Sequence, residues 1–97
     1  MFWAKAFRTR YEIVVAICDE NLLDKELGWR GLKIKVTKSF YGEKLVDERI
    51  AIKLMEKATI GNIFGKNIVA LAKKNGFITK ENIILIDDVP HAQFAKI

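Results

Sequence analysis

The sequence of 97 residues has few of the residue types that form disulfides, zinc clusters and catalytic centres. Cys18 is its only cysteine, so the chain can form no internal disulfide and no structural zinc cluster. His91 is the only histidine and therefore the only conventional base. The sequence identifies no enzyme active site, and we predict neither a cofactor nor a metal site. A lone thiol suits a reducing compartment.

Long apolar runs are absent as well. Uninterrupted apolar runs such as residues 13–18 and 83–86 are far shorter than the roughly 20 residues that cross a bilayer. Residues 1–5 lack the apolar stretch of a signal peptide. We therefore expect a cytoplasmic protein without membrane contact, and the oligomeric state stays open.

What the chain does contain is enough apolar residues for a core. The hydrophobic fraction is 51%, and the length is that of one domain. No internal repeat, low-complexity tract or linker divides the chain. We predict a single domain over residues 1–97.

The net charge of +5 is distributed unevenly. Cations cluster in residues 1–10, 28–44 and 59–80, where Glu43 is the only acidic residue. Acidic residues gather instead at 19–26 and 87–88. Segregated charge can orient an anionic partner, although a solvated lysine-rich surface produces the same composition.

The apolar pattern predicts an α+β fold with a mostly antiparallel sheet of four to five strands and two to three helices. The predicted order is β-β-α-β-(β)-α-α-β. Strands are expected over residues 2–8, 11–18, 32–37 and 83–86, and a short helical turn over 19–27. Residues 40–41 are expected to extend the third strand into a turn. After this turn, Leu45 and Val46 would run back along it as the optional strand of the predicted order.

Two longer helices are predicted in the second half of the chain. Asp47 is the expected N-cap of the first, whose buried residues would be Ile50, Leu54, Met55 and Ala58. Thr59 would cap the second, which ends at Gly76 and buries Ile60, Ile63, Phe64, Ile68, Leu71 and Ala72. Residues 89–93 are expected to be extended or a turn, with too little apolar content to be needed for the core.

Aromatic and basic residues interleave on two of the predicted strands. Trp3, Lys5 and Phe7 share one strand face, and Lys33, Lys35 and Thr37 share another. Neighbouring strands with these faces uncovered would combine stacking rings with phosphate-binding cations, as single-stranded RNA requires. Alternatively, Trp3 and Phe7 belong to the core. The predicted partner is RNA or a ribosome-associated factor, and the predicted nucleic-acid contacts are Trp3, Lys5, Arg8, Arg10, Lys33 and Lys35.

Other candidate sites are weaker. Residues 61–66 resemble a phosphate-binding loop, but the spacing is one residue short and Asn67 replaces the required Ser or Thr. Asp19 and Glu20 would oppose ionisation of Cys18, which is expected to be a core residue rather than a nucleophile. Asp87, Asp88 and His91 form a weak metal-ligand pattern.

Two further hypotheses concern the C-terminal segment and the middle of the chain. A small enzyme or anionic-ligand-binding protein would use His91 and Gln93 near Arg8, since arginine suits phosphate and carboxylate ligands. A protein-interaction module would dock through an edge strand or through Phe40 and Tyr41. The predicted ligand or partner contacts are His91, Gln93, Phe40 and Tyr41.

Several stretches of the sequence resemble domain-of-unknown-function family 424, a set of small archaeal proteins. The resemblance rests on Met1-Phe2, Lys5, Arg8-Thr9, residues 12–20, Phe40-Tyr41-Gly42, Ala58, residues 62–65 and Val89-Pro90-His91-Ala92-Gln93. Asp88 departs from it, because a glycine is expected before Val89. The resemblance implies an archaeal, cytoplasmic protein associated with translation, without an agreed activity or cofactor.

Overall fold

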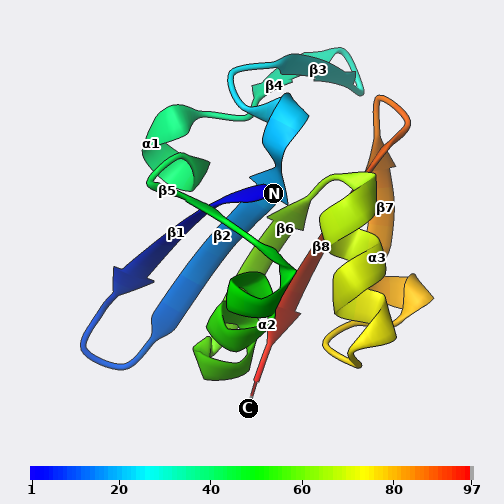
Figure 1. The fold of residues 1–97 in the computed structure, drawn as a ribbon. Coiled ribbons are helices and arrows are strands. Elements are labelled where there is room, and N and C mark those ends of the chain that lie inside the picture. The colour runs from blue at the N-terminus through cyan, green and yellow to red at the C-terminus, as the bar shows by residue number, and fades with distance from the viewer. Residues whose placement is uncertain (97) are drawn as a thin grey trace.

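A mixed six-stranded sheet organises the chain in the computed structural model, which describes residues 1–96 (Figure 1). The strand order is β5-β1-β2-β6-β8-β7, and β3 and β4 form a separate two-stranded sheet. The strands of the main sheet are β1 (Phe2–Arg8), β2 (Ile13–Asp19), β5 (Lys44–Val46), β6 (Ile60–Phe64), β7 (Ile83–Ile86) and β8 (Val89–Ala95). The small sheet consists of β3 (Glu26–Trp29) and β4 (Leu32–Lys35).

Three α-helices and two 3-10 turns complete the fold. The helices are α1 (Lys38–Tyr41), α2 (Glu48–Lys57) and α3 (Lys66–Lys74), and the turns are η1 (Glu20–Leu22) and η2 (Lys80–Asn82). Strand β6 runs parallel to β2, and the other neighbours are antiparallel. The predicted α+β class with a mostly antiparallel sheet is confirmed, whereas the predicted strand count and order fit only in part. Among residues 1–96, no helix is long and apolar enough to cross a membrane.

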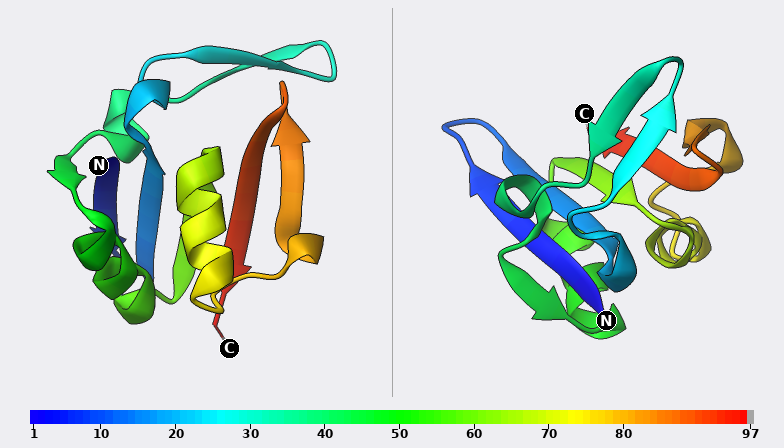
Figure 2. Two further views of the ribbon diagram at one scale, coloured as in Figure 1. Left: turned by 45° about the vertical axis from the view of Figure 1, so that its right-hand side comes forward. Right: turned by 90° about the horizontal axis from the view of Figure 1, so that it is seen from above.

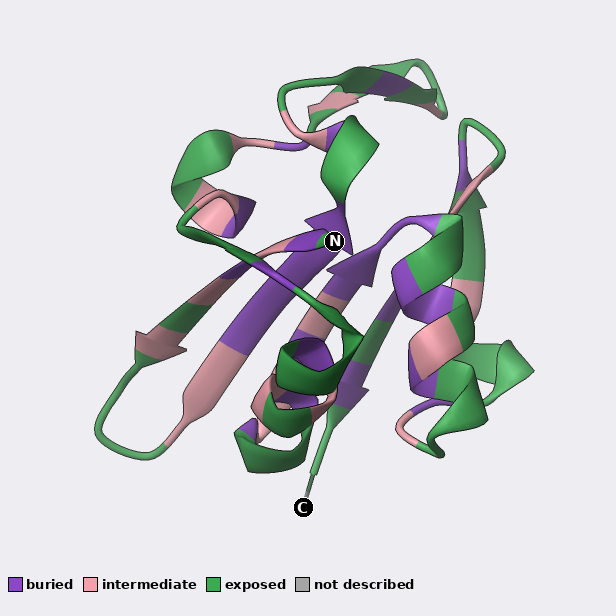
Figure 3. Ribbon diagram, viewed as in Figure 1, coloured by how far each residue is buried: buried purple, intermediate pink, exposed green. Residues whose placement is uncertain are grey.

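One face of the sheet is covered by α2 and α3 (Figures 1 and 3). The strands bury every second side chain on this face, because successive residues of a strand point to opposite sides. The helices close the layer with Ala51, Met55, Ile68 and Ala72, all fully or almost fully buried. The strand residues of the same core are Phe2, Ala4, Val15, Ile17, Val46, Ile63, Ala92 and Phe94.

The other face is covered at one end by residues 26–41, which we call the roof: β3, β4 and α1 (Figure 2). Leu27, Val36 and Tyr41 of the roof pack on Cys18, near the end of β2, and on Phe64, the last residue of β6. A hydrogen bond from the Gly28 amide to Oδ2 of Asp87, at 3.2 Å, ties the roof to the β7–β8 turn. The basic segment 28–44 noted in the sequence therefore forms most of the roof, together with the residues that directly follow it.

Several sequence predictions are confirmed. Strands form where residues 2–8, 11–18, 32–37 and 83–86 predicted them, with small shifts in their ends. Asp47 caps α2, because its Oδ1 accepts the Ile50 amide at 2.9 Å. Gly76 follows α3 with a φ of 80°, and the Phe77 amide returns to the Ala72 carbonyl at 3.0 Å. These predictions depended on local signals alone.

The prediction that Thr59 begins a helix is wrong. Residues 60–64 form β6, in which every side chain is buried or half-buried, so their spacing imitates a helical stripe. Strand and helix are separated at Gly65. Its φ of 126° lies outside helical geometry, so α3 begins only at Lys66. Ile50 is also 41% exposed rather than buried.

Two loop predictions are wrong as well. Residues 40–41 do not extend a strand, since the Thr37 side chain accepts the Phe40 amide at 3.3 Å and caps α1. Only residues 20–22 of the predicted turn at 19–27 are helical, and the following residues enter β3. The segment 89–93 is needed for the core after all, because β8 lies between β6 and β7 and buries Ala92 and Phe94.

Candidate functional site

Polar side chains lie on the roof side of the two strands β6 and β8. Asn62 pairs with Gln93 across these strands, and its other neighbour is Ala16 of β2. One step nearer the roof, Phe64 pairs with His91, which also faces Ile84 of β7. Ala16 is fully buried in the core beneath the roof, so the polar groups gather beside it on β6 and β8.

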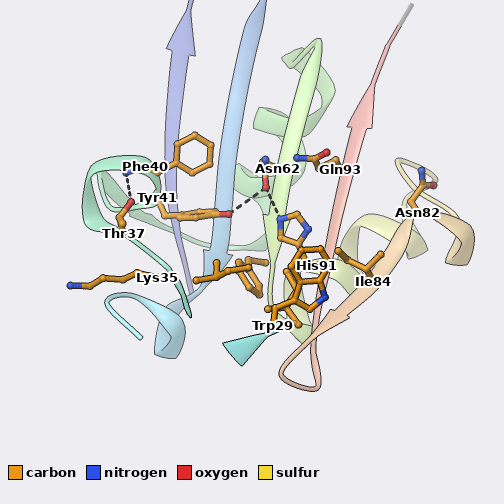
Figure 4. A pocket seen from close by; sticks show the side chains of 13 residues that line it. Trp29, Lys35, Thr37, Phe40, Tyr41, Asn62, Asn82, Ile84, His91 and Gln93 are labelled. Carbon is orange, nitrogen blue, oxygen red and sulfur yellow. Dashed lines mark hydrogen bonds between the residues drawn. The ribbon is translucent and has the colours of Figure 1, made fainter. Parts of the chain in front are cut away.

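A pocket of about 600 Å³ lies between the roof and this part of the sheet (Figure 4). Its volume is in the range of about 300–1,000 Å³ that small-ligand sites occupy. Neither Asp nor Glu lines it. The lining residues are Trp29, Ile34, Lys35, Thr37, Phe40, Tyr41, Asn62, Phe64, Asn82, Ile84, Ile86, His91 and Gln93.

Two side chains converge on one oxygen of Asn62 (Figure 4). Nε2 of His91 lies 2.8 Å from Oδ1 of Asn62, and the Tyr41 hydroxyl donates to the same atom at 3.3 Å. With Oδ1 of Asn62 as the acceptor, the matching neutral tautomer of His91 is the one that carries its proton on Nε2. Burial lowers the pKa of His91, which favours the neutral ring, and burial followed by the nearby Cys18 raises the pKa of Tyr41. The three groups form a hydrogen-bonded network centred on the Asn62 amide.

This network leaves two polar atoms of the site without a partner among residues 1–96. They are Nδ2 of Asn62, a donor, and Nδ1 of His91, an acceptor in the neutral ring. Neither is a buried unsatisfied atom, so both remain accessible from outside the protein. The flexible amide of Gln93 is exposed beside them.

Aromatic rings continue from the site across the roof side of the sheet. His91 and Phe64 meet edge to face at 4.8 Å and 83°, and Phe40 and Tyr41 do so at 4.9 Å and 83°. Phe40 in turn stacks on Phe7 of β1 at 5.5 Å and 28°. The result is a series of adjoining rings from β1 to the pocket.

Cations accompany these rings. Nζ of Lys5 lies 4.9 Å from the Phe7 ring centre and donates to the Ser39 carbonyl at 2.8 Å. The Arg30 guanidinium lies 4.8 Å from the Trp29 ring centre. The pocket is therefore bordered by positive charge on both its sheet and roof sides.

The structure brings together the four residues predicted as ligand or partner contacts. Phe40, Tyr41, His91 and Gln93 all line the one pocket. Tyr41 is only 5% exposed, so it acts from within the pocket wall rather than as part of an exposed docking surface.

The residues predicted for nucleic-acid contact are more scattered. Lys5 lies on the roof side of β1, and Trp3 of the same face is half-buried against the roof core. Lys35 lines the pocket, and Lys33 is exposed on the same strand. The condition that the two basic strands are neighbours is not met, since β4 pairs with β3 in its own sheet.

Arg8 and His91 do not form a common site. Arg8 pairs with Ile13 at the far end of β1. His91 instead aligns across the sheet, through Phe64 and Cys18, with Trp3 near the start of β1. Five residues along a strand span roughly 16 Å, and three strand spacings add roughly 14 Å across the sheet. Arg8 also lies on the same face of β1 as Phe2 and Ala4, so it points to the helix side of the sheet. Arg10, in the β1–β2 turn, lies 5.5 Å from the Tyr11 ring centre.

The weaker candidates have structural explanations. The amides of Asn67 and Ile68 donate to the Asp19 carboxylate at 2.9 and 2.8 Å, so this carboxylate occupies the position at the start of α3 where a phosphate would bind. Cys18 is fully buried, and burial followed by Asp19 raises its pKa to about 12. Among residues 1–96, no group of three or more His, Cys, Asp or Glu side chains could hold a metal ion.

Asn62 is the central residue that sequence reasoning did not assign to a site. The sequence pattern places it in a glycine-containing motif and in a predicted helix, where the alternation that puts it beside Gln93 cannot be recognised. One signal pointed to it: residues 40–42, 62–65 and 89–93 all carry the family resemblance, and each contributes side chains to the pocket.

The fold and the pocket define a small α+β domain with a polar, aromatic-walled pocket on one sheet face. The chain belongs to the family described as "Protein of unknown function (DUF424)", which it matches over residues 7–97. This confirms the resemblance seen in the sequence.

A solved structure shares the fold. It is the crystal structure of an uncharacterized conserved protein from Methanopyrus kandleri, with a TM-score of 0.84 and 24% sequence identity over 99% of this chain and 93% of that chain. A comparison with curated proteins gives no match.

Proposed function

We propose that this protein is an RNA-binding module that holds single-stranded RNA on the roof side of its sheet. The observation that carries the proposal is the pocket itself, in which aromatic walls, accessible polar groups and bordering cations meet without an acidic side chain. Single-stranded RNA is bound by this combination, because rings stack on bases, polar groups read base edges and cations neutralise phosphates. Such RNA could be free or part of a ribonucleoprotein of the translation apparatus.

The chemistry of the site favours binding over catalysis. Nε2 of His91 is engaged with Asn62, and the raised pKa of Tyr41 keeps its hydroxyl protonated. The Cys18 thiol is buried with a raised pKa, so it supplies no nucleophile. The polar groups that line the pocket include an imidazole, an amine, two hydroxyls and three amides, which are suited to recognition.

The proposal is tested by titrating a fluorescent twelve-nucleotide single-stranded RNA at several salt concentrations. Affinity should fall steeply with salt, with a logarithmic slope of about −0.7 for each phosphate contact. The double variant Lys33→Ala/Lys35→Ala should bind more weakly and show a shallower slope. The control Lys73→Ala/Lys74→Ala removes the same charge from α3, on the helix-covered face, and should bind like the wild type. Absent binding, or affinity that does not change with salt, contradicts the proposal.

A second candidate function rests on the edge strand β7. Ile84 and Leu85 are 44% and 58% exposed, and the strand has a neighbour only on its β8 side. An open apolar edge can pair with a strand of another protein. Pull-down from lysate after nuclease treatment, compared between wild type and Leu85→Lys, tests this candidate. Capture of a protein partner that Leu85→Lys abolishes would support it, and unchanged capture would oppose it.

A further inference from the structure

We propose that the RNA-binding surface continues from the pocket along the sheet to the β1–β2 turn, where Tyr11 is a second stacking platform for a base and Arg10 a phosphate contact. The inference rests on the proposed RNA-binding function and extends it to a site outside the pocket. It follows from an exposed aromatic ring beside a cation, and from the open sheet face that joins this pair to the pocket.

The β1–β2 turn presents an aromatic ring to solvent. Tyr11 is 80% exposed, whereas the other Tyr, Trp and Phe side chains of residues 1–96 are buried or half-buried. The Arg10 guanidinium lies 5.5 Å from the ring centre of Tyr11, and at this exposure most of the ring surface is free for stacking. A free ring with an arginine beside it is the combination that binds single-stranded RNA, because the ring stacks on a base and the cation neutralises a phosphate.

An open part of the sheet lies between this turn and the pocket. The roof lies over the end of the sheet opposite to the turn, and α2 and α3 cover the other face (Figure 1). Beyond the row of Asn62, on the side away from the roof, the next row of cross-strand partners consists of Phe7, Val14, Ile60 and Ala95. The first three are half-buried and the fourth is exposed, and none of them carries a charge that would repel a phosphate.

Cations lie at both ends of this open face. Nζ of Lys5 lies beside the Phe7 ring at the pocket end, and Arg10 lies at the turn. The acidic residue next to the turn, Glu12, accepts a hydrogen bond from the Thr59 hydroxyl through Oε2. From the level of Asn62 to Tyr11 is five residues along the chain, roughly 16 Å, so an RNA strand of several nucleotides is needed to reach from the pocket to the turn.

The test measures binding of twelve-nucleotide oligouridine by fluorescence anisotropy. Tyr11→Ala should bind about tenfold more weakly, because one base loses its stacking partner. Tyr11→Phe keeps the ring and should bind like the wild type. Both variants should melt like the wild type, since the side chain is exposed. The control Leu85→Ala removes another exposed apolar side chain from β7, four strands away from β1, and should leave the affinity unchanged.

Arg10→Ala tests the phosphate contact at the turn. Removing one phosphate contact should make the logarithmic dependence of affinity on salt shallower by about 0.7. The control Arg49→Ala removes the same charge from an exposed position on α2, on the helix-covered face, and should keep the slope of the wild type.

The outcomes separate the two proposals. If Tyr11→Ala binds the RNA as tightly as the wild type, the second position is overturned while RNA binding stands. If Tyr11→Phe is as weak as Tyr11→Ala, the ring is not a stacking platform and the inference fails as well. If wild-type protein binds no RNA, the proposed function fails and the inference fails with it.

Discussion

The two faces of the sheet use the same strands for different purposes. On β6 and β8, Ile63, Ala92 and Phe94 point to the helices and are buried. Their neighbours Asn62 and His91 point to the roof side, where they are half-buried and hydrogen-bonded to each other. The helix-covered face is a closed apolar layer, and the roofed face is a partly open layer that keeps polar groups accessible.

This difference indicates where substitutions should affect stability and where they should affect binding. Apolar burial and close packing dominate the helix side, so changes there should cost the most folding free energy. The roof side contributes fewer buried apolar contacts around its pocket. The following predictions test the contrast, beginning with the largest effect.

Gly65→Ala should destabilise the protein by about 3 kcal/mol or more, because it combines backbone strain with steric overlap. Gly65 has a φ of 126°, and an added Cβ would lie 2.3 Å from Cγ of Asp19, whose carboxylate caps α3. Chemical denaturation measures the loss. Gly76→Ala is the control, since Gly76 has a φ of 80° with no atom within 4 Å of an added Cβ, and it should cost about 1 kcal/mol. Equal losses would contradict the role given to the Asp19–Gly65 contact.

His91→Gln should cost about 1 kcal/mol at pH 7.5 and flatten the dependence of stability on pH. Burial lowers the pKa of His91, so the unfolded chain takes up the proton first as the pH falls. The stabilising contribution is therefore complete above the unfolded pKa of about 6.5 and decreases below it.

Unfolding midpoints measured between pH 5 and pH 8 for wild type and variant give this difference directly. His91 is the only histidine, so no other imidazole contributes. Parallel pH profiles for the two proteins would show that the His91 ring titrates normally in the fold.

The smallest effects are expected at the β7–β8 turn, where Asp87 and Asp88 have φ angles of 52° and 63°. Asp88→Gly should stabilise the protein by about 0.5 kcal/mol, because glycine adopts this left-handed conformation without strain. Asp87→Gly relieves the same strain but loses the hydrogen bond to the Gly28 amide, so it should be less stable than Asp88→Gly by about 1 kcal/mol. Equal stabilities would mean that the bond to Gly28 does not hold the roof in place.

The sequence was sufficient for features that depend on local signals. The Asp47 cap, the left-handed Gly76 and the strands at either end of the chain could be predicted from neighbouring residues. Asp88 was noted as a departure where glycine was expected, and its positive φ gives the physical reason for that expectation.

The site could be predicted only in part, because its geometry depends on distant pairing. Phe40, Tyr41, His91 and Gln93 were selected as contacts, but Asn62, which joins them, was assigned to a helix. The β6 segment has the spacing of a helical stripe, and only its pairing with β2 and β8 establishes it as a central strand of the sheet. A single sequence does not contain that information.

The parallel pairing of β2 with β6 also has a consequence for folding kinetics. The hairpins β1–β2, β3–β4 and β7–β8 each join neighbouring segments and can form early. The pairing of β2 with β6, in which Val14 lies opposite Ile60, must close a long loop that includes the whole roof. Asn62 lies on β6, so each hairpin can be complete while the pocket does not yet exist. The ability to bind should therefore appear only in the slowest phase of refolding.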